Sequence, residues 1–267
     1  ITMISRILFK KHLTWGETYL FSLFGFATHG LLDACTSYGT QLFWPFSDDR
    51  ISWNYISVVD PFLTIPVIFT IIFTILMKNK LISIFGIFYI ATYLSFGAFQ
   101  ENRAEKGGQA ISNLRGHVSK NLTVKPSLGN LFLWKTIYEF DGFYYVDAVR
   151  LFHILEFCKG TIIKKLDLTN EFLALNKKSQ QLKDIKRFEW FSQGYLGKKI
   201  DSNIITDVRY SAVPNEVDGL WGIEINQKKD DNEYVDWVVN RSNYTKKWER
   251  FLDLLLGKNC QNLLIKN

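Results

Sequence analysis

Three stretches in the first hundred residues are long, apolar and nearly free of charge. They are residues 18–36, 61–77 and 81–99. The second and third contain no charged residue and are about as long as the ~20 residues that a membrane-crossing helix needs. The tripeptide Lys78-Asn79-Lys80 joins them, and so short a link allows only an antiparallel pair of helices. The pattern therefore predicts membrane insertion of this hairpin.

The first apolar stretch carries a polar stripe. With a period of 3.6 residues, one helix face holds Thr18, Ser22, Gly25, His29, Asp33 and Thr36. The part of this stretch from Thr18 to Leu32 would be only about 23 Å long as a helix, which is short for a bilayer core of about 30 Å. His29 and Asp33 are one helical turn apart, so both can reach the same metal ion. The alternative is a buried histidine that donates a hydrogen bond to a neighbouring helix.

After about residue 109 the pattern becomes that of a soluble α+β domain. Residues 131–140 and 143–152 alternate like strands, and Asp141-Gly142 between them predicts a tight hairpin that pairs Phe140 with Phe143 and Tyr138 with Tyr145. Further strands are expected at 204–213, 220–225 and 234–239, and helices at 178–196 and 245–256. The predicted fold class is an α-helical membrane bundle of about three apolar helices, followed by an antiparallel sheet with helices on one side.

The charge distribution supports two domains. Residues 1–102 contain six Lys/Arg and six Asp/Glu, so the net charge of +6 lies entirely in residues 103–267. We therefore expect a membrane-embedded helical domain at 1–102, with the metal site, and a soluble domain at 103–267. The lysines of the second part are interspersed with acids rather than clustered, which indicates a solvated surface and no nucleic-acid partner. Cys35, Cys158 and Cys260 are far apart and show no CxxC spacing, so the sequence predicts neither a disulfide framework nor a zinc finger.

The residues that can carry chemistry lie mostly in the membrane part. The set is His29, Asp33, Thr36, Tyr38, Gln41, Arg50 and Asp60. Asp60 precedes Pro61, so it either caps a helix or takes part in the site, as a base or by orienting a ligand. Because zinc needs at least three protein ligands, His29 and Asp33 alone do not complete a site. The soluble part offers Arg209, Tyr210, Ser211, Asn215, Trp221 and Glu224, with no recognisable catalytic motif.

The run HGLLDACTSYGTQLFWPFSDDRISWNYISVVDP, residues 29–61, resembles the signature of the YdjM-like membrane-bound metal-dependent hydrolases. Residues 124–150, 187–196 and 207–225 are similar to the C-terminal domain of this family. The resemblance implies a multi-pass bacterial inner-membrane protein with a hydrolase activity like that of zinc-dependent phospholipases C. It implies that His29 and Asp33 are metal ligands. The family's further His- and Asp-containing motifs have no match here. Either the remaining ligands lie upstream of residue 1, or this chain does not assemble a full metal site.

The preferred hypothesis is a membrane hydrolase that acts on a phosphoester of a membrane lipid. The enzyme would use a divalent metal ion, which we expect to be zinc. The metal would lower the pKa of a bound water and polarise the scissile group. The alternative is a non-enzymatic, membrane-anchored binding or scaffold protein whose polar stripe only packs helices. A transporter is disfavoured because no inverted repeat is visible.

The orientation follows from the basic residues. Arg6, Lys10 and Lys11, together with Lys78 and Lys80, are expected on the cytoplasmic side. Three spans then place the C-terminal domain on the periplasmic side.

Overall fold

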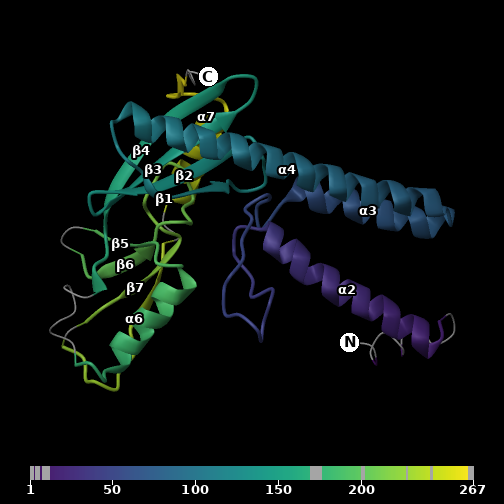
Figure 1. Ribbon diagram of the computed structural model, residues 1–267, viewed down its shortest axis with the longest axis horizontal. Coiled ribbons are helices and arrows are strands. Elements are labelled where there is room, and N and C mark those ends of the chain that lie inside the picture. The colour runs from purple at the N-terminus through teal and green to yellow at the C-terminus, as the bar shows by residue number, and fades with distance from the viewer. Residues whose placement is uncertain are drawn as a thin grey trace. The chain divides into compact units, whose positions relative to one another are not determined.

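In the computed structural model of the chain, the first apolar segment forms helix α2, Trp15–Cys35 (Figure 1). The structure describes residues 13–168, 176–199, 202–226, 228–240 and 243–263, together with Met3 and Ile7. Helix α2 begins earlier than Thr18 because Thr14 and Glu17 form a reciprocal cap. The Thr14 hydroxyl accepts from the Glu17 amide, and the Glu17 carboxylate accepts from the Thr14 amide. Its 21 residues give a length of about 32 Å, so the expected length of about 23 Å was wrong.

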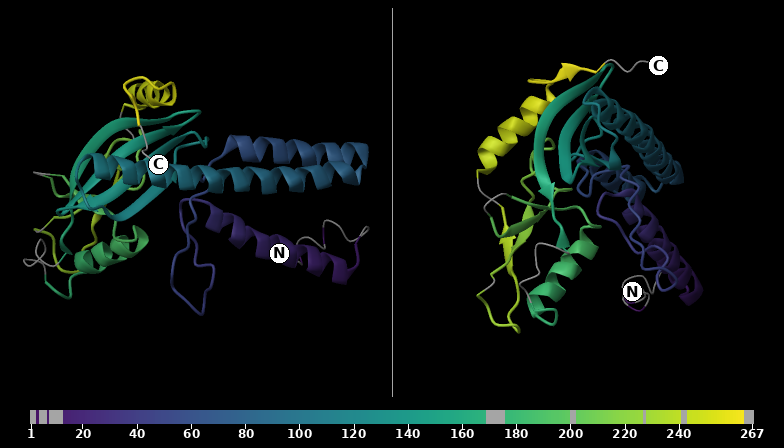
Figure 2. Two further views of the ribbon diagram at one scale, coloured as in Figure 1. Left: turned by 45° about the horizontal axis from the view of Figure 1, so that its top comes forward. Right: turned by 60° about the vertical axis from the view of Figure 1, so that its left-hand side comes forward.

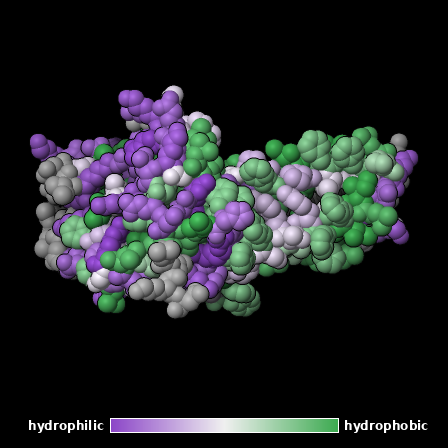
Figure 3. Space-filling view, turned by 90° about the horizontal axis from the view of Figure 1, so that it is seen from above, coloured by the Kyte–Doolittle hydropathy of each residue, from purple (hydrophilic) through white to green (hydrophobic). Residues whose placement is uncertain are grey.

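Helices α3, Pro61–Met77, and α4, Lys80–Leu114, follow. Hydrogen bonds between them confirm the antiparallel pair, since Tyr89 Oη donates to Phe62 O at 2.5 Å and Ser83 Oγ to Thr74 Oγ1 at 3.2 Å. Within the described residues, α4 is the one helix long and apolar enough to cross a membrane, while α3 is apolar but shorter. Hydrophobic side chains cover much of this region on the face seen in Figure 3.

The chain divides into two compact units, Ile1–Ala98 and Phe99–Asn267. The second unit contains a sheet of nine strands among the described residues, and every pairing between them is antiparallel. The strands lie in the order β1 to β8, and β9 pairs with β4. Their bounds are β1 Lys120–Pro126, β2 Leu133–Phe140, β3 Phe143–Leu151, β4 Leu155–Lys165, β5 Leu196–Lys198, β6 Ile204–Asp207, β7 Trp221–Glu224, β8 Asp236–Val239 and β9 Gln261–Asn262.

The predicted hairpin between β2 and β3 is confirmed. Phe140 pairs with Phe143 and Tyr138 with Tyr145, and the two tyrosine rings stack with centroids 5.1 Å apart. Asp141 and Gly142 both have positive φ angles, of 49° and 76°, which is the backbone of the turn that closes a two-residue hairpin.

The helices of this unit cover both faces of the sheet, so the expected placement on one side was wrong. Side chains alternate along a strand. Leu133 and Ala148 therefore face the helix α7, Tyr244–Leu255, and pack in one cluster with its Phe251 and Leu254. On the opposite face, Gly107 and Gly108 of α4 lie close to Val149 and Thr136. The right-hand view of Figure 2 shows α7 and the end of α4 on opposite sides of the long strands.

Helix α6, Gln180–Phe191, packs against the shorter strands. It begins where the Ser179 hydroxyl accepts from the Leu182 amide. Its Ile185 and Phe188 join a buried cluster with residues of β5, β6 and β7, namely Leu196, Ile205 and Ile223.

Several predicted elements differ in the structure. The strand expected at 204–213 ends at Asp207, because the Asp207 carboxylate accepts from the Arg209 amide and turns the chain. Strands β1 and β4 were not predicted, since lysines and Gly160 interrupt their apolar pattern. Cys158 and Cys260 form a disulfide across a sequence separation of 102 residues, which the spacing of the cysteines did not predict.

Candidate functional site

His29 and Asp33 lie on the same side of α2. His29 Nε2 and Asp33 Oδ2 are 3.4 Å apart, as the spacing of one turn predicts. The side chains are 71% and 48% exposed, so neither is enclosed within the unit. Both atoms are therefore available to a common ligand.

The geometry of this pair fits two ligands of one zinc ion. Tetrahedral bonds of about 2.0 Å place two ligand atoms roughly 3.3 Å apart, close to the observed separation. Among the residues that the structure describes, however, no group of three or more His, Cys, Asp or Glu side chains comes together. The pair therefore supplies two candidate ligands, and a zinc site needs at least one more protein ligand.

The two threonine hydroxyls of the polar stripe bond to backbone oxygens of their own segment. Thr18 Oγ1 donates to Thr14 O and Thr36 Oγ1 to Asp33 O, each at 2.8 Å. Such bonds satisfy a threonine hydroxyl locally in an apolar helix. These threonines stabilise the helix surface and leave His29 and Asp33 as the metal-binding candidates of the stripe.

Asp60 caps helix α3. Its Oδ1 accepts from the amides of Phe62 and Leu63 at 3.1 and 3.2 Å. Tyr93 Oη on α4 lies 2.9 Å from both carboxylate oxygens, and Asp60 is only 4% exposed. These contacts agree with the expected role of Asp60 as a helix cap. Its role as a base stays a prediction.

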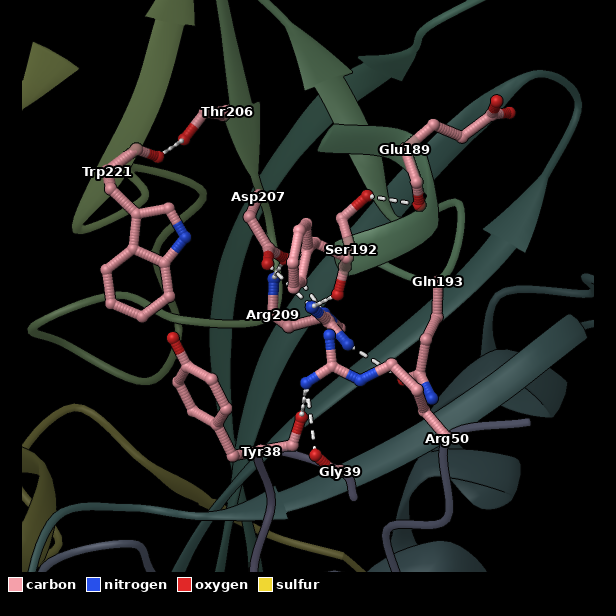
Figure 4. Close-up of polar contacts among 11 residues, drawn as sticks. Tyr38, Gly39, Arg50, Glu189, Ser192, Gln193, Thr206, Asp207, Arg209 and Trp221 are labelled. Atoms are coloured by element: carbon pink, nitrogen blue, oxygen red, sulfur yellow. Dashed lines mark hydrogen bonds and ion pairs between the residues drawn. The ribbon is translucent and has the colours of Figure 1, made fainter. Parts of the chain in front are cut away.

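Arg50 organises the segment between α2 and α3. Its Nη2 donates to the carbonyl oxygens of Tyr38 and Gly39 at 3.1 and 3.0 Å (Figure 4). Gln41 Nε2 donates to Asp48 O in the same segment. Both side chains therefore stabilise the local backbone.

The second unit contains a buried ion pair between Asp207 and Arg209. Arg209 Nε and Nη2 donate to the two carboxylate oxygens at 2.9 and 2.8 Å, and each side chain is 3% exposed (Figure 4). The remaining donors reach Gln193 Oε1 and Phe191 O, which ties α6 to the sheet. Burial acts to lower the pKa of Arg209, but the bond to Asp207 outweighs it and raises the pKa. A fully bonded pair of this kind fixes structure and offers no free group for chemistry.

Two buried lysines on neighbouring strands are functional candidates that the sequence did not reveal. Lys125 of β1 pairs directly with Lys135 of β2, and both are 4% exposed. Burial lowers the pKa of each to about 7. Lys135 Nζ donates to Ser211 Oγ at 2.8 Å and to Glu216 O at 2.7 Å, so it holds the segment after β6 against the sheet. The signal available in the sequence was Lys135 within the apolar run of β2, because β1 was not predicted as a strand.

The aromatic candidates of this unit pack against one another. Tyr210 and Trp221 lie with ring centroids 5.2 Å apart, and the Lys125 ammonium lies 5.4 Å from the Tyr210 ring. Asn215 Nδ2 donates to Lys159 O, while Glu224 is exposed at the end of β7. None of these contacts brings the candidates into a cluster with a nucleophile and a base.

The family model of the YdjM inner membrane protein matches residues 1–104 of the chain. It confirms the resemblance for this part of the chain, and the resemblance of the later segments stays a prediction. No curated protein and no solved structure matches the chain.

Proposed function

Because residues 1–104 match the YdjM inner membrane protein family, we propose that this is an inner-membrane hydrolase that binds a divalent metal through His29 and Asp33. The substrate class that we propose is a phosphoester of a membrane lipid. The observation that carries the proposal is the separation of 3.4 Å between two exposed ligand atoms on one helix face.

His29 Nε2 and Asp33 Oδ2 would hold the ion, and one further protein ligand completes the coordination. Zinc supplies a bound water of lowered pKa and a Lewis acid for a phosphoryl oxygen. A base role for Asp60 requires Tyr93 to release its carboxylate, because the tyrosine hydroxyl lies 2.9 Å from both oxygens. Tyr93 therefore controls the availability of Asp60 in this proposal.

We further propose that α2, α3 and α4 all lie in the membrane, with the second unit on the periplasmic side. The basic residues around 6–11 and 78–80 support this orientation through the positive-inside rule. The disulfide between Cys158 and Cys260 supports it independently, since disulfides persist in the periplasm and are rare in the cytosol.

Metal analysis of the full-length protein tests the metal site. The protein is purified in detergent, loaded with zinc, freed of excess metal and analysed by inductively coupled plasma mass spectrometry. We expect about one zinc per chain, and at least a tenfold weaker affinity in His29→Ala and Asp33→Asn because each removes one ligand. Thr28→Ala is the matched control, since Thr28 is next to His29 and its hydroxyl bonds only to its own helix, at Phe24 O and Gly25 O.

The same preparations test the hydrolase. The rate at which a phosphorylated headgroup is released from phospholipid vesicles should depend on zinc. In both variants this rate should decrease in parallel with the affinity for zinc. Equal zinc content in the wild type and both variants would overturn the assignment of the ligands. Zinc binding without hydrolysis of any phospholipid would overturn the activity and leave the metal site.

The second candidate is a membrane-anchored binding or scaffold protein without catalysis. The incomplete ligand set within the described residues favours it. Under this alternative the purified protein is free of metal, and His29→Ala leaves its thermal stability unchanged.

A further inference from the structure

The polypeptide enters the second unit through the helical turn that follows the apolar run of α4. Gln100 Nε2 donates to Leu131 O at 2.9 Å and to Leu151 O at 3.2 Å. Arg103 Nη2 donates to Phe152 O at 2.8 Å. The loop between β1 and β2 and the loop between β3 and β4 are therefore fixed beside residues 100–103. We call these two segments, residues 127–132 and 152–154, the entry loops.

The entry loops expose apolar side chains. Leu128 and Ile154 are 58% and 56% exposed, and Phe132 and Phe152 are 36% and 39% exposed. The two phenylalanine rings stack with centroids 4.7 Å apart. The stacked rings, with Leu128 and Ile154 on the same two loops, make an exposed apolar patch, and such patches mark contact surfaces.

Internal bonds hold the entry loops in place. Asn130 Oδ1 accepts from the amides of Phe132 and Leu133 at 3.0 and 2.8 Å, and Asn130 Nδ2 donates to Ser127 Oγ at 2.9 Å. Gln100, which holds both loops, is fully buried. The exposed side chains thus project from a braced backbone.

Arginines border the patch. The Arg103 guanidinium lies 5.7 Å from the Phe99 ring. That of Arg150 lies 4.2 Å from the Phe152 ring but is paired with Glu156, so Arg103 is the cation that this patch offers to a phosphate. Aromatic rings beside cationic side chains suit the boundary between lipid headgroups and acyl chains, where the rings are buried and the cations meet phosphate. The chemistry of the patch therefore favours an anionic lipid surface as its partner.

We propose that the entry loops insert into the headgroup region of the bilayer that α4 crosses and so dock the second unit on the membrane. The proposal rests on the proposed membrane location. Gln100 directly follows the apolar run of residues 81–99, and Arg103 is about 6 Å beyond Phe99 along the helix axis. The loops bonded to these residues consequently lie at the depth of the headgroups.

A fluorescent probe on the full-length protein tests the docking. The protein, with Cys35→Ser to remove its free thiol, is labelled with the environment-sensitive dye NBD at Ile154→Cys and reconstituted in vesicles of phosphatidylcholine and phosphatidylglycerol. The matched control is the label at Asp141→Cys, in the turn at the other end of β3. The nine residues of this strand place it about 30 Å away.

We expect blue-shifted NBD emission at position 154 and at least threefold stronger quenching by spin-labelled lipids than at position 141. Equal quenching at the two positions would overturn the docking. A blue shift at 154 without lipid quenching would also overturn it and would identify a protein partner or a second copy as the occupant.

Extraction with alkaline carbonate separates this inference from the membrane proposal itself. The triple variant Phe132→Ser, Phe152→Ser, Ile154→Ser should stay in the membrane pellet, because α4 is unchanged. An NBD label at Leu128→Cys in this variant should lose most of its quenching by lipid. Release of the unaltered chain by carbonate would overturn the membrane proposal, whereas retained quenching in the triple variant would overturn only the docking.

Discussion

Lys125 and Lys135 show how pairing and burial in the sheet lower the pKa of a lysine. Like charges directly opposite each other on paired strands destabilise a sheet, and burial further disfavours the ammonium forms. For Lys125, burial is the largest cause of the lowered pKa, followed by Arg209, while Asp207 opposes the shift. For Lys135, burial lowers the pKa while Asp207, Glu216 and Asp218 oppose it.

These pKa values of about 7 predict how the stability of the second unit depends on pH. An unfolded lysine titrates near 10.4, so between pH 7 and 10 the unfolded chain binds more protons than the folded chain. The free energy of unfolding therefore rises over this range, by up to about 1.4 kcal/mol per pH unit for each lysine. Below pH 7 both states carry the protons, and the full cost of burying the charges remains.

The substitution Lys125→Met should remove about half of this rise, because it eliminates one of the two lowered pKa values. Urea unfolding of the full-length protein in detergent, at several pH values between 7 and 9.5, measures the slope. Lys159→Met, at an exposed position on β4, is the control and should keep the slope of the unaltered chain. An unchanged slope in Lys125→Met would contradict the assignment of a lowered pKa to Lys125.

At the scale of elements, α4 combines two environments in one helix. Its first part is apolar and mostly exposed, while Ala104, Ile111 and Ser112 in its later part are buried against the sheet. Arg115, just after its end, donates to both carboxylate oxygens of Asp147 on β3, at 2.6 and 2.9 Å. Bidentate bonds of this type fix orientation as well as distance, so the end of α4 is attached to the sheet in one position.

Strand β4 is crossed closely by the segment after β6. A Cβ atom on Gly160 would lie 2.0 Å from Val146 O and 2.3 Å from Asn215 O. Both neighbours are backbone atoms, so a side chain at this point requires a shift of the backbone and glycine fits best.

We therefore expect Gly160→Ala to lower the free energy of unfolding by about 3 kcal/mol, at the upper end of the cost of overpacking. Thermal unfolding followed by circular dichroism measures the loss. Lys159→Ala, the adjacent and exposed substitution, should change the stability by less than about 0.5 kcal/mol. A Gly160→Ala protein as stable as this control would show that the segment does not approach β4 so closely.

At the scale of the whole molecule, the disulfide links the middle of the second unit to its last described strand. Cys260 lies just before β9, which pairs with β4 at Glu156 and Phe157. A crosslink across 102 residues removes much of the conformational freedom of the unfolded chain and stabilises by about 4–5 kcal/mol in the chain-entropy model. The second unit is therefore expected to depend on an oxidising compartment for full stability.

This dependence tests the proposed orientation. In intact bacterial cells, Cys158 and Cys260 should resist alkylation by a thiol reagent until a reductant is added, and should become reactive in a strain without periplasmic disulfide formation. Modification is read as a shift in gel mobility, with Cys260→Ser as the reference for an unpaired Cys158. Reactive thiols in wild-type cells without reductant would place the second unit in the cytosol.

The sequence by itself determined the features that depend on neighbours along the chain. The helix at Pro61–Met77, the hairpin at Asp141-Gly142 and the proximity of His29 to Asp33 follow from apolar run length, turn chemistry and the helical period. Each of these signals lies within a few residues, so no tertiary contact was needed to recognise it.

Only the tertiary structure decided which distant residues meet. The pairing of Cys158 with Cys260, the burial of Lys125 against Lys135 and the hydrogen bond from Tyr93 to Asp60 join segments that are separated along the chain. Such contacts depend on sheet order and helix packing, which local hydrophobic periodicity does not encode. For the same reason α4 and α7 lie on opposite faces of the sheet, because the alternation of side chains along β2 and β3 offers two faces to cover.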